Sequence, residues 1–343
     1  MIERRDVLRL GALLGLGGSG SLFPGFDRPA FAAEKLPVQI VNTAGDTTLI
    51  EQELMRQQGY LEQFGLDAQM LNVGDGSKLM GALLNGTEDI SVISGFSQVF
   101  PAIVRGAKMK IIAGSELLVE LCVYAKKPEI KSLKDLQGKT VATGSLGALL
   151  HQLMLALFQK HGIDPSTVTF VNVGGASDSF RAVTAGTVDA GPGPLAVYNQ
   201  QDKYGVHSLS DGNMWSEIPE YTYQGAYVTD EAIAAKRDVL VRTLAAFAKL
   251  YRFMQSPESK DAFVTAREAI LKTLDPVALR EQAADHWEFC QKYRPFAVDL
   301  VLSEERIDYM QRLNIAVGLQ QEILPYAQVT DMTLARDALK LIN

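Results

Sequence analysis

The chain has 343 residues and a formal net charge of −7 at pH 7, with 33 Lys and Arg against 40 Asp and Glu. This acidic balance argues against nucleic acid or an anionic membrane as a partner, because like charges repel. The 311 residues that follow position 32 are enough for two compact domains, each with its own hydrophobic core.

Residues 1–32 are predicted to be an export signal. Arg4 and Arg5 resemble a twin-arginine motif, a Gly-rich apolar run follows, and the Ala-Phe-Ala of residues 30–32 offers small residues to a signal peptidase. The apolar run is too short and too rich in Gly for a membrane span of ~20 residues. We therefore expect a periplasmic protein, exported by the twin-arginine route, whose mature charge is −8 because the segment removes four Arg and three acidic residues.

In the first half of the chain, apolar strands alternate with helical stretches, as expected for a parallel sheet covered on both faces. The first helix should begin after the loop at 42–45, with Asp46 or Thr47 as its N-cap. The expected strands of this half are 38–41, 68–73, 90–93, 110–114 and 121–125.

Two stretches about 100 residues apart have the same pattern. Residues 72–74 and 172–174 both read Asn-Val-Gly, and residues 86–89 and 186–189 both read Gly-Thr-x-Asp. Each stretch is typical of a strand, a turn, and a helix that ends at a Gly with positive φ, followed by a second strand. The repeat of this βαβ unit predicts two similar α/β lobes with a cleft between them.

The last third of the chain is predicted to be mainly helical. Residues 221–228 alternate with period two and should form a strand that returns to the first lobe. Proline residues then separate the expected helices. We expect this tail to pack on the first lobe and to carry no chemistry. The predicted helices are 235–255, 258–273, 276–292, 303–319 and 331–342.

The string Leu-Lys-Asp-Leu-Gln-Gly-Lys-Thr-Val at 133–141 resembles the start of the second lobe in periplasmic solute-binding proteins. The resemblance is to the nitrate, sulfonate, taurine and thiamine-pyrimidine-precursor group, and it covers nearly all of the mature chain. It implies a two-lobed α/β fold of type II, with open sheets flanked by helices and a helical C-terminal tail. Lobe one would hold 33–118 and 222–343, and lobe two 119–221. It also implies a monomer that delivers a small ligand to an ABC permease.

No specific catalytic or metal-binding pattern is present. The four histidines are not in metal spacing, and the chain has neither a dinucleotide fingerprint nor a Gly-x-Ser-x-Gly elbow. We therefore predict a binding protein with no catalytic residues, cofactor or metal. Cys122 and Cys290 could pair in an oxidising compartment or remain as buried free thiols, which we favour.

The ligand site is expected in the loops that follow the strands, where helix N-termini carry free N–H groups that favour anions. Asp46, Asp75 and Asp178 would either cap helices or pair with a ligand amine. Phe96, with Tyr198 or Tyr227, would either line the cleft or pack in the core. The predicted ligand-binding residues are Thr43, Gly45, Asp46, Thr47, Gly74, Asp75, Ser94, Gly95, Phe96, Ser145, Leu146, Ala176, Ser177, Gly193 and Tyr227.

These turns contain no Arg, which a phosphate ester would normally require. We therefore expect a small organic anion, a sulfonate or carboxylate. One alternative is a flat pyrimidine precursor of thiamine, held between Phe96 and a Tyr. Another is a sensory module that presents its ligand to a membrane receptor. An enzyme related to the pyrimidine-precursor synthases of the same superfamily would need a Cys-rich motif in the cytosol, and this chain has two cysteines and a predicted export signal.

Overall fold

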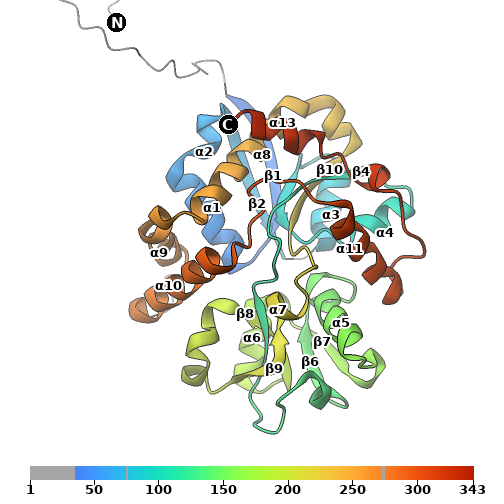
Figure 1. Ribbon diagram of the computed structural model, residues 1–343, viewed down its shortest axis with the longest axis vertical. Helices are drawn as coiled ribbons and strands as arrows, with labels where there is room; N and C mark the ends of the chain where they lie inside the picture. Colours follow the sequence, from blue (N-terminus) through green and yellow to red (C-terminus); the bar gives the residue numbers. More distant parts are fainter. Residues whose placement is uncertain (1–34, 75, 272–274) are drawn as a thin grey trace, which may run out of the picture.

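A computed structural model describes residues 35–74, 76–271 and 275–343, so the predicted export signal and Asp75 lie outside the described residues. The protein has two α/β lobes, each built on one mixed sheet, shown in the upper and lower halves of Figure 1. The first sheet contains β1 (Leu36–Thr43), β2 (Leu66–Val73), β3 (Ser91–Ser94), β4 (Met109–Gly114) and β10 (Gly225–Thr229). The second contains β5 (Leu121–Ala125), β6 (Thr140–Thr143), β7 (Thr169–Asn172), β8 (Ala190–Pro194) and β9 (His207–Asn213).

Helices flank both sheets. Those that come before β10 are α1 (Asp46–Gln58), α2 (Tyr60–Gln63), α3 (Gly76–Leu84), α4 (Val99–Val104), α5 (Leu149–His161), α6 (Ala176–Ala185) and α7 (Met214–Glu217). Those after it are α8 (Asp230–Met254), α9 (Lys260–Ile270), α10 (Pro276–Tyr293), α11 (Glu304–Ala316), α12 (Tyr326–Val329) and α13 (Thr333–Lys340). Short 3₁₀ helices are η1 (Leu133–Leu136), η2 (Pro165–Thr167), η3 (Leu195–Tyr204) and η4 (Pro257–Ser259).

The two sheets share one strand order. In lobe two it is β7-β6-β8-β5-β9. In lobe one, a parallel bridge between Ile40 and Ile90 joins the β1-β2 pair to the β3-β10-β4 group, which gives β2-β1-β3-β10-β4. The chain enters lobe two after β4 and returns before β10.

The sheets are mixed, which corrects the expectation of a parallel sheet in the first half of the chain. Strand β10 runs antiparallel to β3 and β4, and β5 runs antiparallel to β8 and β9. These two strands are the ones that enter each sheet from the other lobe. Such a strand reaches its sheet from the opposite end, so it cannot follow the right-handed βαβ connection that keeps strands parallel.

The internal repeat is confirmed at the level of individual hydrogen bonds. Gly86 (φ 70°) and Gly186 (φ 75°) end the helices of the two units in the left-handed conformation that Gly adopts at least cost. After each, a Thr hydroxyl donates to a carbonyl five residues earlier: Thr87 to Ala82 at 3.0 Å and Thr187 to Ala182 at 3.1 Å. The two helices therefore end in the same way, with the same residue types at matching positions.

The helical tail does more than cover lobe one, because it also contacts lobe two. Helix α10 reaches η3 of lobe two, where Gln282 donates to the Gln200 side chain at 3.1 Å and Lys203 pairs with Glu281 at 2.7 Å. Helix α9 packs against α1 of lobe one. Because α9 and α10 pack together and span the two lobes, their side chains can reach the space between the sheets.

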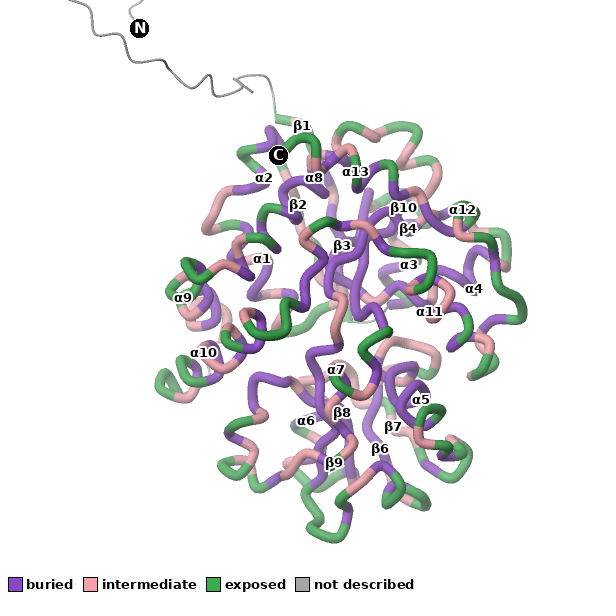
Figure 2. The backbone as a smooth tube through the Cα atoms, in the orientation of Figure 1, coloured by how far each residue is buried: buried purple, intermediate pink, exposed green. Residues whose placement is uncertain are grey.

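Buried residues run through the strands of both lobes, and exposed residues lie on the outer helices and turns (Figure 2). Cys122 and Cys290 are both buried free thiols. No helix within the described ranges is long and apolar enough to cross a membrane.

Candidate functional site: the cleft between the lobes

A cavity of about 620 Å³ lies between the two lobes, within the ~300–1,000 Å³ that small-molecule sites occupy. Its walls come from the loops after β1, β2, β6 and β7, at the carboxyl ends of these strands, where open α/β sheets bind ligands. Nine of the predicted site residues line it: Thr43, Gly45, Asp46, Thr47, Gly74, Gly95, Ser145, Ala176 and Ser177.

Four helix N-termini contribute to the cavity. Gly45, Ala148 and Gly175, the N-caps of α1, α5 and α6, line it, and so does Gly76, the first residue of α3. The free N–H groups and partial positive charge of such helix ends favour an anion or a hydrogen-bond acceptor. The sequence therefore placed these four loops correctly around one space.

Asp46 does not cap α1. The N-cap is Gly45, no side chain caps this helix, and Asp46 is the first helical residue. This corrects the prediction that Asp46 or Thr47 is the N-cap. The Asp46 carboxylate instead accepts a hydrogen bond from the Ser177 hydroxyl of lobe two at 3.1 Å. Asp46 and Ser177 therefore join the two walls of the cleft.

Asp178 is a helix cap. Its carboxylate accepts the backbone N–H of Gly175, the N-cap of α6, at 3.1 Å, and it also pairs with Arg181. Both residues line the cavity, but each is already paired. They are therefore weak candidates for a ligand charge.

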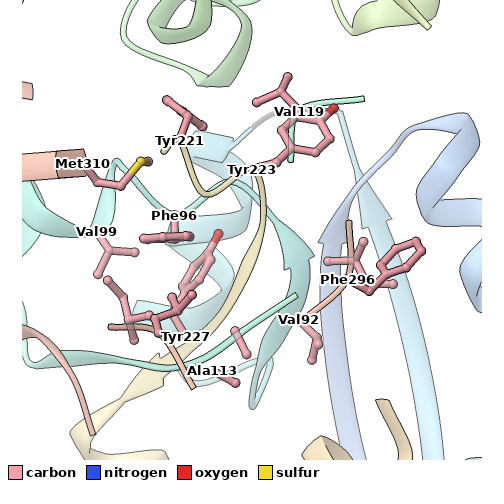
Figure 3. Close-up of a cluster of buried hydrophobic side chains, with 14 of the residues drawn as sticks. Val92, Phe96, Val99, Ala113, Val119, Tyr221, Tyr223, Tyr227, Phe296 and Met310 are labelled. Atoms are coloured by element: carbon pink, nitrogen blue, oxygen red, sulfur yellow. The ribbon is translucent and has the colours of Figure 1, made fainter. Parts of the chain in front are cut away.

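Three predicted site residues lie in the core of lobe one instead of the cleft. Phe96 and Tyr227 are completely buried and pack in the apolar cluster of Figure 3. The Tyr227 hydroxyl donates to the Gly95 carbonyl at 3.2 Å. Ser94 is also buried, and its hydroxyl accepts the backbone N–H of Thr43 at 2.9 Å. These residues support Gly95 and Thr43, which do line the cavity.

Two more predicted site residues lie away from the cavity. Leu146 points to solvent, with 73% of its surface exposed, while its neighbour Ser145 lines the cleft. Gly193 lies within β8, where an added Cβ would come within 2.8 Å of both Phe180 and Tyr124. Gly193 is therefore required for packing beneath two rings. Of the aromatic candidates, Tyr198 packs edge-on against Trp215 and is also absent from the cavity wall.

Arg267 is the main functional candidate that sequence reasoning missed. It lies on α9, lines the cavity and is only 3% exposed. Burial lowers the pKa of Arg267, while the nearby Asp46 carboxylate raises it, and a guanidinium stays charged in proteins. Its Nη2 donates to Gln282 at 2.7 Å, but its Nε has no hydrogen-bond partner among the described residues, and the carboxylate that acts on its charge is that of Asp46. A buried guanidinium with an unsatisfied N–H favours an anion as its ligand.

Glu120 and His286 form a buried pair at the cavity wall. Each is about 3% exposed, and His286 Nε2 lies 2.5 Å from Glu120 Oε2. The sulfur of Cys290 is 4.0 Å from the other Glu120 oxygen. The sequence pointed to none of these as site residues, because Glu120 is more than 160 positions from His286 and no spacing links them.

Two further acids, Glu51 and Glu116, are completely buried close to Glu120. Burial raises the pKa of Glu51 to about 8 and raises that of Glu116 well above its ordinary value. No donor from any other described residue reaches their carboxylate oxygens. Burial therefore favours the protonated, uncharged form of each of these acids.

A buried hydrogen-bond network joins the lobes on the other side of the cleft. Ser97, which lines the cavity, bonds through its hydroxyl to Gln152 of α5. The Asn314 amide of α11 donates to the Ser97 carbonyl at 2.8 Å, and Gln152 donates to the Asn314 oxygen at 3.4 Å. Lobe one, lobe two and the tail therefore meet at these three side chains.

Comparison with known protein sequences identifies a matching family and a similar protein. The sequence model of the family described as "NMT1/THI5 like" matches residues 54–259. The Bacillus subtilis protein named "Putative binding protein YtlA" is 21% identical over 334 residues, which cover 94% of this chain and 96% of that protein.

Solved structures share the architecture. The alkanesulfonate-binding protein SsuA of Xanthomonas axonopodis, bound to MOPS, has a TM-score of 0.69 at 18% identity, covering 87% of this chain and 99% of that one. The nitrate-binding protein NrtA of Synechocystis has a TM-score of 0.67 at 11% identity, covering 90% of each chain. Both likenesses confirm the expected periplasmic-binding-protein fold.

Proposed function

The chain belongs to the NMT1/THI5-like family, and from that premise we propose that it is the solute-binding protein of an ABC importer. Its ligand is a small organic anion, a sulfonate or carboxylate, bound in the cleft between the lobes. Residues 33–118 and 222–343 form lobe one in this proposal, and 119–221 form lobe two. The alkanesulfonate and nitrate specificities of the two solved relatives are in keeping with an anionic ligand.

The observation that carries this proposal is the Arg267 guanidinium. It lines the cavity, is buried, and its Nε has no hydrogen-bond partner among the described residues. An anionic group that accepts from its free Nε would neutralise the charge by a strong charge-assisted hydrogen bond. The four helix N-termini add N–H donors to the same cavity.

A flat, uncharged pyrimidine fits less well. Phe96 and Tyr227, the expected clamp, are in the core, and Tyr223 is the one Phe, Tyr or Trp among the cavity-lining residues that the structure describes. A stacked heterocycle normally lies between two rings or apolar faces. An uncharged ring would also bring no further negative charge to Arg267.

Binding is also favoured over catalysis. Of the two cysteines, only Cys290 lies near the cavity wall, and burial raises its pKa well above that of a free thiol, with Glu120 adding to the shift. At neutral pH it is therefore a thiol, whereas nucleophilic cysteines are thiolates. The proposal therefore includes no catalytic residue in the cleft.

Calorimetry on ligand-stripped protein tests the ligand class. Taurine, MOPS, short alkanesulfonates and carboxylates form one panel, and aminopyrimidines form the other. Arg267→Gln should weaken the bound anion about 10- to 100-fold, as expected for loss of a charged hydrogen bond. Arg181→Gln is the matched control, because Arg181 also lines the cavity but is already paired with Asp178. Tight aminopyrimidine binding without binding of any anion would reject the proposal.

The proposal includes a periplasmic monomer that docks on a membrane permease and is exported by the twin-arginine route. Replacement of both Arg4 and Arg5 by Lys should stop export without preventing folding. Accumulation of that double variant in the periplasm would exclude this route.

A further inference from the structure

Glu120, His286 and Cys290 bring three different metal-binding side chains to one buried point. One donor atom from each lies within 4.8 Å of the other two. They come from the crossover before β5 and from two turns of α10, where positions 286 and 290 are four apart and share a helix face. The protein's fold, not a local motif, assembles this set.

The surroundings leave several buried polar atoms without a hydrogen-bond partner. Among the described residues, His286 Nδ1 and both carboxylate oxygens of Glu116 have no hydrogen-bond partner, although both side chains are at least 97% buried. Glu120 acts electrostatically on Glu116, and both acids act on Cys290. Buried acids gathered in this way are stabilised by a bound cation.

The donor types select the class of cation. A thiolate sulfur, an imidazole nitrogen and a carboxylate oxygen are the ligands of Zn²⁺ and its neighbours, whereas Mg²⁺ and Ca²⁺ prefer oxygen alone. Ligand atoms of a tetrahedral zinc ion lie roughly 3.5 Å apart. The present separations are therefore close to that geometry, and small side-chain movements would complete it.

We propose that Glu120, His286 and Cys290 form a binding site for a divalent transition-metal ion of the zinc type. Glu120 and His286 line the cleft, so the ion enters from there. Three protein ligands leave the fourth position open toward the cavity, as in zinc sites that bind a further molecule. On binding, the Cys290 thiol releases its proton to solvent and its sulfur coordinates as the thiolate.

The experiment uses untagged mature protein, freed of metal by a chelator and then dialysed. Cobalt(II) is titrated first, because a cobalt–thiolate bond gives a charge-transfer band in the near ultraviolet. Zinc is then added to displace it and is measured separately by calorimetry. The expected result is one equivalent of each ion and a cobalt band that zinc abolishes. Absence of binding, or binding without the band, overturns the proposal. No organic ligand is present, so the outcome is independent of the anion proposal.

Two cysteine variants identify the sulfur. Cys290→Ser should lose the band, and Cys122→Ser should keep it, because Cys122 is equally buried but lies in the separate core of lobe two. The reverse pattern overturns the proposal. Circular dichroism shows whether each variant folds. If Cys290→Ser does not fold, Glu120→Gln is the variant that tests the site. We expect the zinc affinity of Glu120→Gln to be at least about tenfold lower than that of the wild-type protein. An unchanged affinity contradicts the site.

Discussion

Ser177 donates a hydrogen bond to Asp46 across the cleft, with 3.1 Å between the hydroxyl oxygen and the carboxylate. Ser177 lies in the first turn of α6 in lobe two, and Asp46 is the first residue of α1 in lobe one. The bond can exist only while the lobes are close together. It is therefore a marker of the closed arrangement, and it lies at the wall of the proposed ligand site.

Replacing Ser177 by Ala should make closure less favourable. A hydrogen bond of this kind contributes about 0.5–1.5 kcal/mol, so ligand affinity should fall by roughly 2- to 12-fold. X-ray scattering should show that wild-type protein contracts when ligand is added, and that the variant needs more ligand for the same contraction. Ser216→Ala is the control, since its hydroxyl bonds to Asn213 within lobe two. Equal effects of the two variants would show that the Ser177 bond has no special role in closure.

Asn314→Ala should destabilise the folded protein. Asn314 donates to the Ser97 carbonyl and accepts from Gln152, and all three are buried where the lobes meet the tail. Loss of the amide leaves buried polar groups unpaired, at about 1–3 kcal/mol. Urea unfolding measures the difference. Asn85→Ala at an exposed position should change the free energy of unfolding little, and a similarly small change at Asn314 would count against a structural network.

Asp189 should make the free energy of unfolding depend on pH in acidic solution. Its partial burial acts to raise its pKa, but bonds from Lys127 and Thr140 outweigh this and hold the pKa at about 2. The unfolded carboxyl has a pKa of ~3.9 and so binds more protons below that pH. This stabilisation is therefore complete above about pH 4 and is lost as the pH falls through about 2.

Asp189→Asn tests this directly. We expect a loss of about 1–2 kcal/mol at pH 7 that shrinks toward pH 2–3, where the wild-type carboxyl also becomes protonated. Chemical denaturation at both pH values measures it. Asp67→Asn, at an exposed position of β2, is the control. A deficit of equal size at pH 7 and pH 2 would mean that the Asp189 charge is not what stabilises the fold.

Both thiols should be unreactive in the native protein. Cys122 and Cys290 are free and completely buried, and burial raises the pKa of Cys122 to about 12. A water-soluble disulfide reagent at pH 8 should therefore label neither, and should label both after denaturation without reductant. One or no reactive thiol after denaturation would show that the cysteines had paired or oxidised.

The sequence determined the local features because each depends on neighbours in the chain. The repeated Gly-Thr-x-Asp block predicted two matching units, and the tertiary structure extends the match. The Asp89 carboxylate accepts the N–H of Gln39 at 2.9 Å, and Asp189 accepts that of Thr140 at 2.8 Å. Strand ends followed by Gly-rich turns likewise identified the loops at Thr43, Gly74, Ser145 and Ala176, which line the cavity.

Only the tertiary structure decided which side chains complete the cleft. Phe96 lies in one of the predicted loops, but its ring turns into the core of lobe one, and packing against the rest of that lobe sets this direction. Arg267 and His286 belong to helices whose sequence predicts a surface tail. They reach the cavity because α9 and α10 fold back across both lobes. Contacts between residues far apart in the chain depend on how whole helices pack, and no short stretch of sequence encodes that.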